Sequence, residues 1–438
     1  VEDLTQFARL EHLCGDPALG LRIGVEVQGL LGEMLLQLLG GAGVAGAVED
    51  LTQFAGLEHL CGDPALDHVK CFTVYLRGAG YFCTNNAKTD YQFAPPFTAW
   101  DELSKEAHWR NRPEDAPFFA VFNLTMTHES GTFKSKKRLP RVTDPAKVQI
   151  PPYYPDTPIV RDDIARTYDN IAKMDERVGQ LLGELEEAGH QDDTIVVFFS
   201  DHGVGLPRGK RCVYASGTHV PLIVCHPGAE ASVTDRLVSF VDFAPTTLSI
   251  ASIEPPEWMM GHAFDGAHEA PAQPFVFFHA DRMDAETDRS RAVTDGRYRY
   301  IRNGMTDRPR LYPVAYAEGV ATTGEIHKLR AEGTATEAQW QLVSLTKPEE
   351  ELYETQADPH EIRNLIGKPA SEETVTTLRE ALEASGQRFT EQRAAVCRFL
   401  ASTEKHPTAD EVFLAVRSEI PVISLATVYK SLETLVGC

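Results

Sequence analysis

Residues 194–211 read TIVVFFSDHGVGLPRGKR, and this stretch decides how the chain folds. Ile195 to Phe199 form an unbroken β-branched and aromatic run, which is typical of a strand buried on both faces of a parallel sheet. The run ends at Ser200-Asp201-His202-Gly203. In α/β folds, ligands bind at the carboxyl ends of the strands. The stretch therefore predicts an α/β fold with a polar site at the end of this strand.

The flanking sequence continues the alternation of strands and helices. Residues 118–124 (FFAVFNL) and 220–225 (VPLIVC) are two further apolar runs. Helices are predicted over 69–80, which ends in glycine, and over 160–188, where apolar residues recur at helical spacing before Gly189. This alternation predicts a sheet with helices on both faces.

Two further patterns of predicted strands and helices follow residue 273, and they divide the chain into parts. Short strand patterns and one helix predict a smaller α+β subdomain, with strands at 275–279, 290–294, 298–302 and 351–353 and the helix at 371–385. The last part of the chain predicts three short helices, at 390–402, 408–419 and 424–436. The expected divisions are therefore 1–66, 67–273, 274–385 and 386–438.

Composition limits the classes of function. The 438 residues include 64 acidic and 42 basic side chains, which give a net charge of −22. Such a surface as a whole repels nucleic acid and anionic membranes. No run of 18 uncharged apolar residues occurs, so no membrane-spanning helix and no membrane partner are expected. None of the eight cysteines forms a C-x-x-C pair, which argues against a zinc ribbon or a thioredoxin-type site.

The polar end of the strand at 194–200 carries the candidate chemistry. Asp201 and His202 together suit a divalent cation. Arg208, Lys210 and Arg211 follow on a glycine-containing loop, where three cations can hold a tetrahedral oxyanion. The alternative interpretation of this loop is a solvated basic turn.

Two other motifs could face the same anion. His128 lies just past the strand at 118–124, where a histidine can act as a general acid or donate to an oxyanion. Lys88 follows Asn85-Asn86-Ala87. Taken alone, His128 would more often be structural and Lys88 an ordinary surface lysine.

Together these motifs resemble the sulfatase branch of the alkaline-phosphatase superfamily, nearest to sulfamidase-like bacterial sulfatases. The resemblance covers about residues 67–385 and includes GYFCTNNAKTDYQF, the THES motif, the SDHG–RGK segment and the closing ELYETQADPHEIRNL. It implies an alkaline-phosphatase-like sheet, bound Ca²⁺, and hydrolysis of sulfate esters or sulfamates by a formylglycine nucleophile on a sulfated carbohydrate or small sulfated substrate.

The resemblance also implies roles for individual residues. Asp201 and His202 match calcium ligands, and Lys210 matches the lysine that contacts the sulfate. His128 matches the histidine that helps to protonate the leaving group, and Lys88 matches the lysine near the formylglycine. Arg208, Arg211 and His219 lie in the same loops, where they could contact substrate.

The sequence departs from the family at the nucleophile. Formylglycine is made from Cys or Ser in C/S-x-P/A-x-R. None of the eight cysteines lies in this motif, and no Ser version occurs upstream of Lys88. The paired N-terminal aspartates that complete the calcium site have no counterpart either. We therefore expect a sulfatase-type chain that is inactive as written, with an incomplete Ca²⁺ site. A pseudoenzyme that binds sulfated glycans without cleaving them is an alternative.

The first 66 residues contain a duplication. Residues 1–19 and 48–66 differ only at Arg9 and Gly56. Solenoid proteins generally need at least three repeats for stability, so two near-identical copies favour a recent duplication or an assembly fault. This acidic segment is not expected to be a native domain.

The last 50 residues resemble the winged-helix domain of the ferric-uptake-regulator family, in HPTADEVF and SLATVYKSLETL. That resemblance places Tyr429 and Lys430 on the DNA-facing helix, with Arg388 and Arg393 near the phosphates. A second alternative function is therefore a metal-responsive, DNA-binding regulator fragment fused to a degenerate enzyme domain, with nucleic acid contacted only through this segment. Sulfatases of this kind are generally periplasmic or secreted, whereas a regulator works in the cytoplasm, so the location stays open. A helical appendage without a specific role is also possible for the tail.

Overall fold

The structure is a computed structural model. It describes residues 70–89, 96–134, 140–283 and 286–385, together with parts of the C-terminal segment, namely 395–396, 399–400, 403, 407–420, 423 and 428. The duplicated segment of residues 1–66 therefore lies outside the described residues. Among the described helices, none combines the length and the apolar character needed to cross a membrane.

The first layer contains parallel strands and one antiparallel pair. Strand β1 (Phe82–Asn86) lies between β2 (Glu102–Leu103) and β3 (Phe118–Phe122), and both pairings are parallel. Strand β4 (Val196–Phe199) pairs with β5 (Leu222–Cys225). Because β1, β3 and β4 are followed by the loops that carry Lys88, His128 and Asp201, these strands position the candidate site.

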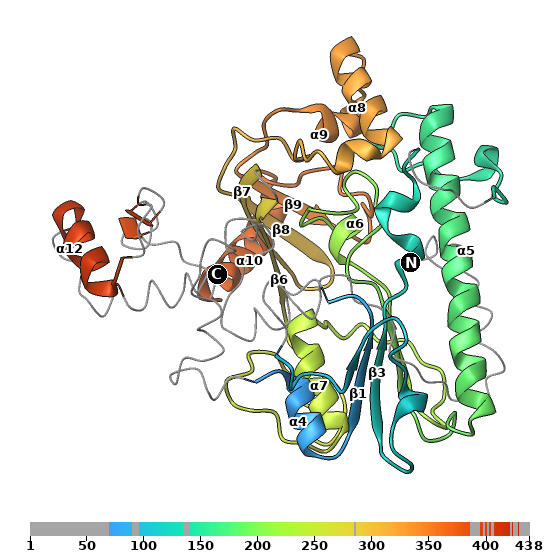
Figure 1. The fold of residues 1–438 in the computed structure, drawn as a ribbon. Helices are drawn as coiled ribbons and strands as arrows, with labels where there is room; N and C mark the ends of the chain where they lie inside the picture. Colours follow the sequence, from blue (N-terminus) through green and yellow to red (C-terminus); the bar gives the residue numbers. More distant parts are fainter. Residues whose placement is uncertain are drawn as a thin grey trace.

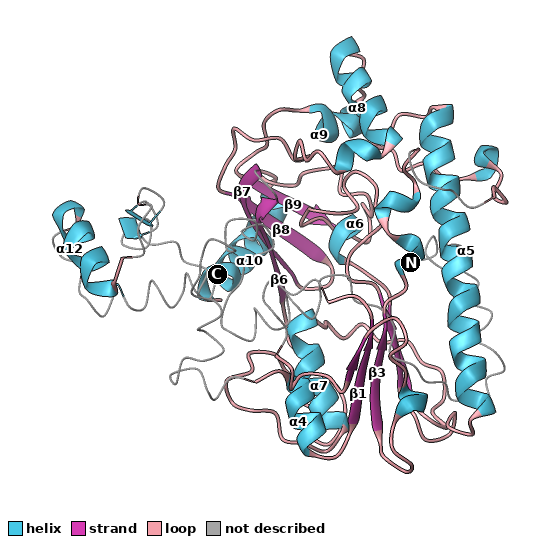
Figure 2. Cartoon of the chain, viewed as in Figure 1, coloured by secondary structure: helices cyan, strands magenta, loops and turns pink. Residues whose placement is uncertain are grey.

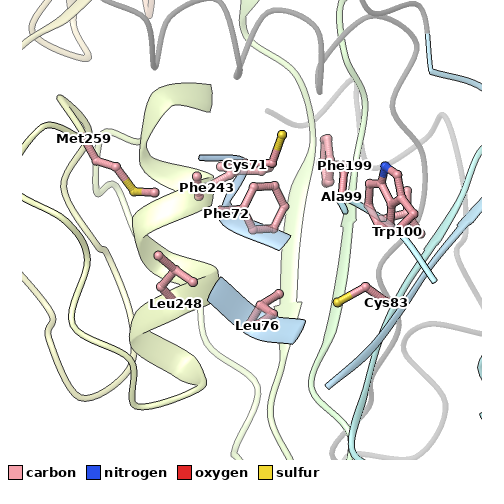
Figure 3. Close-up of a cluster of buried hydrophobic side chains, with 12 residues drawn as sticks. Cys71, Phe72, Leu76, Cys83, Ala99, Trp100, Phe199, Phe243, Leu248 and Met259 are labelled. Atoms are coloured by element: carbon pink, nitrogen blue, oxygen red, sulfur yellow. The ribbon is translucent and has the colours of Figure 1, made fainter. Parts of the chain in front are cut away.

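Helices cover both faces of this layer, as predicted (Figure 1). Helices α4 (Phe72–Gly78) and α7 (Phe243–Ile250) lie on one face, and the long helix α5 (Pro158–Glu187) lies on the other. Side chains of β4 alternate between the two: Phe199 packs in the cluster with α4 and α7, whereas Val196 and Phe198 pack with α5. Figure 3 shows the first cluster, where Phe72 and Leu76 of α4 face Phe243 and Leu248 of α7.

A second sheet follows in the chain. It is antiparallel throughout, in the order β6-β7-β8-β9. Its strands and helix α10, which packs against β7 and β8, are seen in Figure 2. Their bounds are β6 (Val276–Met283), β7 (Glu286–Thr294), β8 (Tyr298–Asn303), β9 (Glu350–Glu354) and α10 (Glu372–Ala384). This is the α+β part that the strand patterns after residue 274 predict.

One strand departs from the prediction. Residues 220–225 are expected to form a buried strand of a parallel sheet, but β5 runs antiparallel to β4 and is only half-buried. Leu222 pairs with Phe199 and Cys225 with Val196, so the chain enters β5 at the end where β4 finishes. The connection contains only the four-residue helix α6 (Ala215–Thr218), and a parallel return would need a crossover to the opposite end of the sheet.

Other helices extend the predicted set. Helices α8 (Ala321–Glu332) and α9 (Glu337–Val343) occupy the stretch before β9, where no helix was predicted. In the C-terminal segment, α12 (Ala409–Glu419) matches the helix expected over 408–419, and its Thr408 and Glu411 form a capping box. The helices expected at 390–402 and 424–436 lie almost entirely outside the described residues.

Candidate active site

The loop after β4 is built from close backbone approaches. The Ser200 hydroxyl donates to the carbonyl of His202 (2.7 Å), and the Gly203 amide donates to the carbonyl of Gly217 (3.0 Å). A Cβ at Gly203 would lie 1.9 Å from the carbonyl oxygen of Ser216. Glycine is therefore required at this position by the approach of the chain around α6, and it fixes where Asp201 and His202 lie.

Asp201 and His202 place two unsatisfied atoms together. Asp201 Oδ2 and His202 Nε2 are buried without a hydrogen-bond partner, and Nε2 lies 3.6 Å from Asp201 Oδ1. The His202 Nδ1 atom lies 2.6 Å from the Gly203 carbonyl, which makes Nδ1 the protonated nitrogen and leaves a lone pair on Nε2. A carboxylate oxygen and an imidazole nitrogen, each buried without a hydrogen-bond partner, suit a cation.

Burial controls the titration of this pair. Burial raises the pKa of Asp201 to about 6, although Lys210 and Lys88 act to lower it. Burial, together with the positive charge of Lys210, lowers the pKa of His202 to about 3. Near neutral pH the imidazole is therefore neutral, as a metal ligand must be.

The cation site is only partly furnished by the described residues. They contain no group of three or more His, Cys, Asp and Glu side chains that could hold a metal ion. Calcium takes six to eight oxygen ligands. Asp201 and His202 would therefore supply two donors of a larger set.

The loop after β3 presents His128. Its Nδ1 lies 2.9 Å from the Ser130 hydroxyl and accepts from the Ser130 backbone amide (3.2 Å). With Nδ1 accepting, the neutral imidazole carries its proton on Nε2. This tautomer suits donation of a proton or hydrogen bond to a leaving group.

Glu129 is the residue that sequence reasoning missed. Its side chain is 1% exposed, and its Oε2 lies 2.8 Å from Arg211 Nη2 and 3.3 Å from Lys210 Nζ. The carboxylate thus joins the loop after β3 to the basic loop after β4. Glu129 could have been proposed from the sequence, because it lies next to His128 just after a strand. Only the histidine of the THES motif was considered as a site residue.

Gly205 allows those two loops to meet. A Cβ at this position would lie 2.3 Å from Glu129 Cβ and 2.5 Å from Glu129 Cα. No L side chain fits in that space, so the two loops touch only because residue 205 is glycine.

Lys210 and Lys88 act on the same carboxyl. Burial lowers the pKa of Lys210, while Glu129 and Asp201 raise it. Lys88 is half-buried after β1, in a turn where Ala87 has a positive φ of 97° and the Asn85 side-chain amide donates to the Lys88 carbonyl (3.1 Å). Because Lys88 and Lys210 both lower the pKa of Asp201, the structure brings together the ends of β1 and β4.

Arg208 and His219 do not contact the cluster around Glu129 in the way that Lys210 and Arg211 do. Arg208 is 2% exposed, with its guanidinium 4.2 Å from the ring of Tyr214, and it donates to Gln341 Oε1 (3.3 Å) and to the Glu361 carbonyl (3.2 Å). This position favours a structural contact with the second subdomain over contact with a substrate. His219 is exposed at the end of α6.

The residues that the ferric-uptake-regulator resemblance places near DNA belong to the C-terminal segment. Tyr429, Lys430, Arg388 and Arg393 lie outside the described residues.

Comparison with known proteins matches three ranges of the chain to family models. Residues 67–253 match the family model described as Sulfatase, and residues 207–312 match the one described as N-sulphoglucosamine sulphohydrolase, C-terminal. Residues 384–437 match the Ferric uptake regulator family.

Individual relatives are similar over most of this chain. It is 43% identical over 352 residues to an ulvan-active sulfatase of Formosa agariphila, an alignment that covers 72% of this chain and 59% of that protein. It is 30% identical over 272 residues to human N-sulphoglucosamine sulphohydrolase, covering 58% of this chain and 53% of that protein. The chain thus spans little more than half the length of these relatives.

A solved 2-O GAG sulfatase shares the fold. Its TM-score is 0.51 at 15% identity, and the alignment covers 84% of this chain and 83% of that one.

Proposed function

The segment of this chain from residue 67 to residue 312 belongs to the sulfatase family, and on this premise we propose that it binds sulfated carbohydrates at the site of Lys210, Arg211 and His128. The reaction class that the family resemblance implies is hydrolysis of sulfate esters or sulfamates. The observation that carries the proposal is the cationic cluster on Glu129, beside the unsatisfied pair Asp201 and His202. Ulvan-type sulfated carbohydrate is the substrate class that the Formosa agariphila relative suggests.

The charges of the cluster fit an anion. Lys210, Arg211 and Lys88 bring three positive charges, which outnumber the carboxylates of Glu129 and Asp201. A sulfate group bound there accepts charge-assisted hydrogen bonds, which are about twice as strong as neutral ones. Glu129 holds Lys210 and Arg211 in place, so that little side-chain entropy remains to be lost on binding.

The proposed division of labour follows the geometry. Lys210 binds the sulfate, and His128 donates from Nε2 to the leaving oxygen or nitrogen. Asp201 and His202 hold a divalent cation, which the resemblance identifies as Ca²⁺ and which would stabilise negative charge on the sulfate oxygens. Arg211, which Glu129 holds in place, adds a positive charge beside Lys210. Lys88 adds another positive charge from the loop after β1.

We further propose that the chain as written binds without turnover. None of the cysteines or serines of the sequence lies in a C/S-x-P/A-x-R motif, so no formylglycine precursor is present in these 438 residues. Loss of a nucleophile commonly removes several orders of magnitude of rate. The chain then acts as a sulfated-glycan-binding protein with a sulfatase fold.

Calorimetry tests the binding proposal. The ligands are inorganic sulfate and a sulfated oligosaccharide prepared from ulvan. Lys210→Met should weaken binding of both by about tenfold to a hundredfold, since a hydrogen bond to a charged group contributes about 1.5–3 kcal/mol. Lys328→Met removes an exposed lysine of α8 and should leave both affinities unchanged. Equal effects of the two variants, or no binding by the parent chain, would contradict the proposal.

Sulfate release measured by ion chromatography tests the absence of turnover separately. We expect no release above the rate without protein. Release that disappears in Lys210→Met would show that the chain is active and would overturn the second proposal alone.

The match of residues 384–437 to the Ferric uptake regulator family supports a second candidate, DNA binding by the C-terminal segment. The full chain in a gel-shift assay should then bind duplex DNA at low salt, and Lys430→Ala should weaken binding. Phosphate contacts made by lysine and arginine predict that binding falls as salt rises, and the net charge of −22 predicts that binding is weak. No shift at low salt would remove this candidate.

A further inference from the structure

An exposed aromatic ring lies next to the proposed leaving-group acid. Tyr316 comes from the connection between the second sheet and α8, far in sequence from the loop after β3. Its ring centroid is 5.9 Å from that of His128, and the two ring planes are nearly perpendicular, at 72°. Tyr316 remains 44% exposed. A large ring is therefore presented to solvent at the edge of the site.

The ring is held by packing rather than left free to move. Its centroid is 5.1 Å from that of Phe133, which is itself buried. The Tyr316 carbonyl accepts from the Gly319 amide (3.1 Å) in a short 3-10 turn. A Cβ at Gly319 would lie 2.6 Å from the Phe133 ring, so the turn presses closely on the ring that supports Tyr316. The side chain is positioned before any ligand arrives.

Because Tyr316 lies next to His128, the role of His128 indicates which part of a ligand would contact the Tyr316 ring. If His128 donates to the atom that leaves with the sugar, the sugar lies on the His128 side of the sulfate. The faces of sugar rings carry C–H groups, and an aromatic ring of fixed orientation offers them apolar surface at little entropic cost. The Tyr hydroxyl can in addition exchange hydrogen bonds with sugar hydroxyls.

We propose that Tyr316 is a specificity-determining contact that stacks against the sugar ring carrying the sulfate. This inference rests on the proposed function and adds to it the recognition of the carbohydrate, as distinct from recognition of the sulfate group. Tyr316 thereby discriminates sulfated sugars from inorganic sulfate.

Binding measurements on the full chain test the inference without requiring turnover. The probes are inorganic sulfate and a sulfated ulvan oligosaccharide, and the variants are Tyr316→Ala and Tyr316→Phe. Tyr316→Ala should weaken oligosaccharide binding about tenfold, in keeping with the usual contribution of an aromatic contact, and change sulfate binding by less than about twofold. Tyr316→Phe should retain most of the oligosaccharide affinity, because the ring remains.

Trp340→Ala is the matched control, since Trp340 of α9 is an exposed aromatic residue (62%) that has no ring contact with His128 among the described residues. It should leave both affinities unchanged. The urea midpoints of all three variants report whether each one folds.

Each contrary outcome is distinct. Unchanged oligosaccharide affinity in Tyr316→Ala, or an equal loss in Trp340→Ala, would overturn the inference. Equal weakening of sulfate and oligosaccharide would show that Tyr316 acts through His128, which also overturns it. If the parent chain binds sulfate but not the oligosaccharide, this inference fails and the anion site stands. If it binds neither, the proposed function itself fails.

Discussion

Glu361 offers the sharpest test of what holds the basic loop in place. Its side chain is fully buried, with Oε1 2.9 Å from Arg299 Nε and Oε2 3.7 Å from Arg208 Nη2. Oε2 also accepts the backbone amide of Ala215 (2.9 Å). One carboxylate of the second subdomain therefore serves two buried guanidiniums and the first residue of α6.

The cost of removing this carboxylate follows from its surroundings. Burial raises the pKa of Glu361, while Arg299 and Arg208 lower it, so burying the charge offsets much of the gain from the pairs. Deleting one partner is different, because it leaves buried charge uncompensated and costs about 3–5 kcal/mol. We expect Glu361→Gln to lose about 3 kcal/mol, since the amide keeps the shape and one acceptor, and Glu361→Ala to lose more.

Urea unfolding followed by tryptophan fluorescence measures the loss, because Trp100 and Trp109 are buried in the first layer. With a slope of about 3 kcal/mol per molar urea, a loss of 3 kcal/mol moves the midpoint by about 1 M. Glu383→Gln is the control: its pair with Arg302 spans 3.6 Å between side chains that are 38% and 50% exposed. Such surface pairs contribute about 0–1 kcal/mol. Equal midpoints for Glu361→Gln and Glu383→Gln would refute the reasoning.

The other predictions concern the loop itself. In the absence of cations, Asp201→Asn should stabilise the chain at pH 8 by about 3 kcal/mol. The pKa of Asp201 is about 6 in the folded state and 3.8 ordinarily, so the parent chain loses stability as pH rises from about 4 to about 6. The gain should nearly vanish at about pH 3, where the parent carboxyl is mostly protonated in both states, and an equal gain at both pH values would contradict this. Ca²⁺ should raise the melting temperature of the parent chain but not of the variant. Gly205→Ala should destabilise the chain by about 1–3 kcal/mol and weaken sulfate binding, because the new methyl group meets Glu129. Gly183→Ala, in α5 with open space around it, should instead stabilise by up to about 1 kcal/mol, and destabilisation by both substitutions would count against the close approach.

Local patterns predicted the elements that bury one or both faces. The apolar run at 194–200 became β4, and the helical spacing over 160–188 became α5, because burial imposes those periods on the sequence. Helix α8 was not predicted, although it ends at Gly333 in the left-handed conformation, and Thr336 with Gln339 forms a capping box before α9. The direction of β5 depends on the path of the preceding loop, which no local pattern encodes.

The candidate site was predictable only in part. The SDHG and THES motifs gave Asp201, His202 and His128, since polar residues just after apolar strands stand out. The contacts that each side chain makes with distant parts of the chain could not be predicted from local sequence. Arg208 was named as a residue that could contact substrate, and its guanidinium lies against Gln341 and the Glu361 carbonyl, more than 130 residues away in the chain. Glu129 was likewise recognisable only once Lys210 and Arg211 were seen to meet on it.

The Glu361 contacts also order events during synthesis. The basic loop emerges from the ribosome long before its anchor, because Arg208 and Glu361 are 153 residues apart. Strand β1 can pair with β3, and β4 with β5, while the second sheet is still being made. Lys210 and Arg211 can then already meet Glu129, but Arg208 gains its carboxylate partner only after residue 361 has appeared. A nascent chain halted between β5 and β9 would therefore hold an assembled first layer and a basic loop that Glu129 contacts but Glu361 does not yet reach.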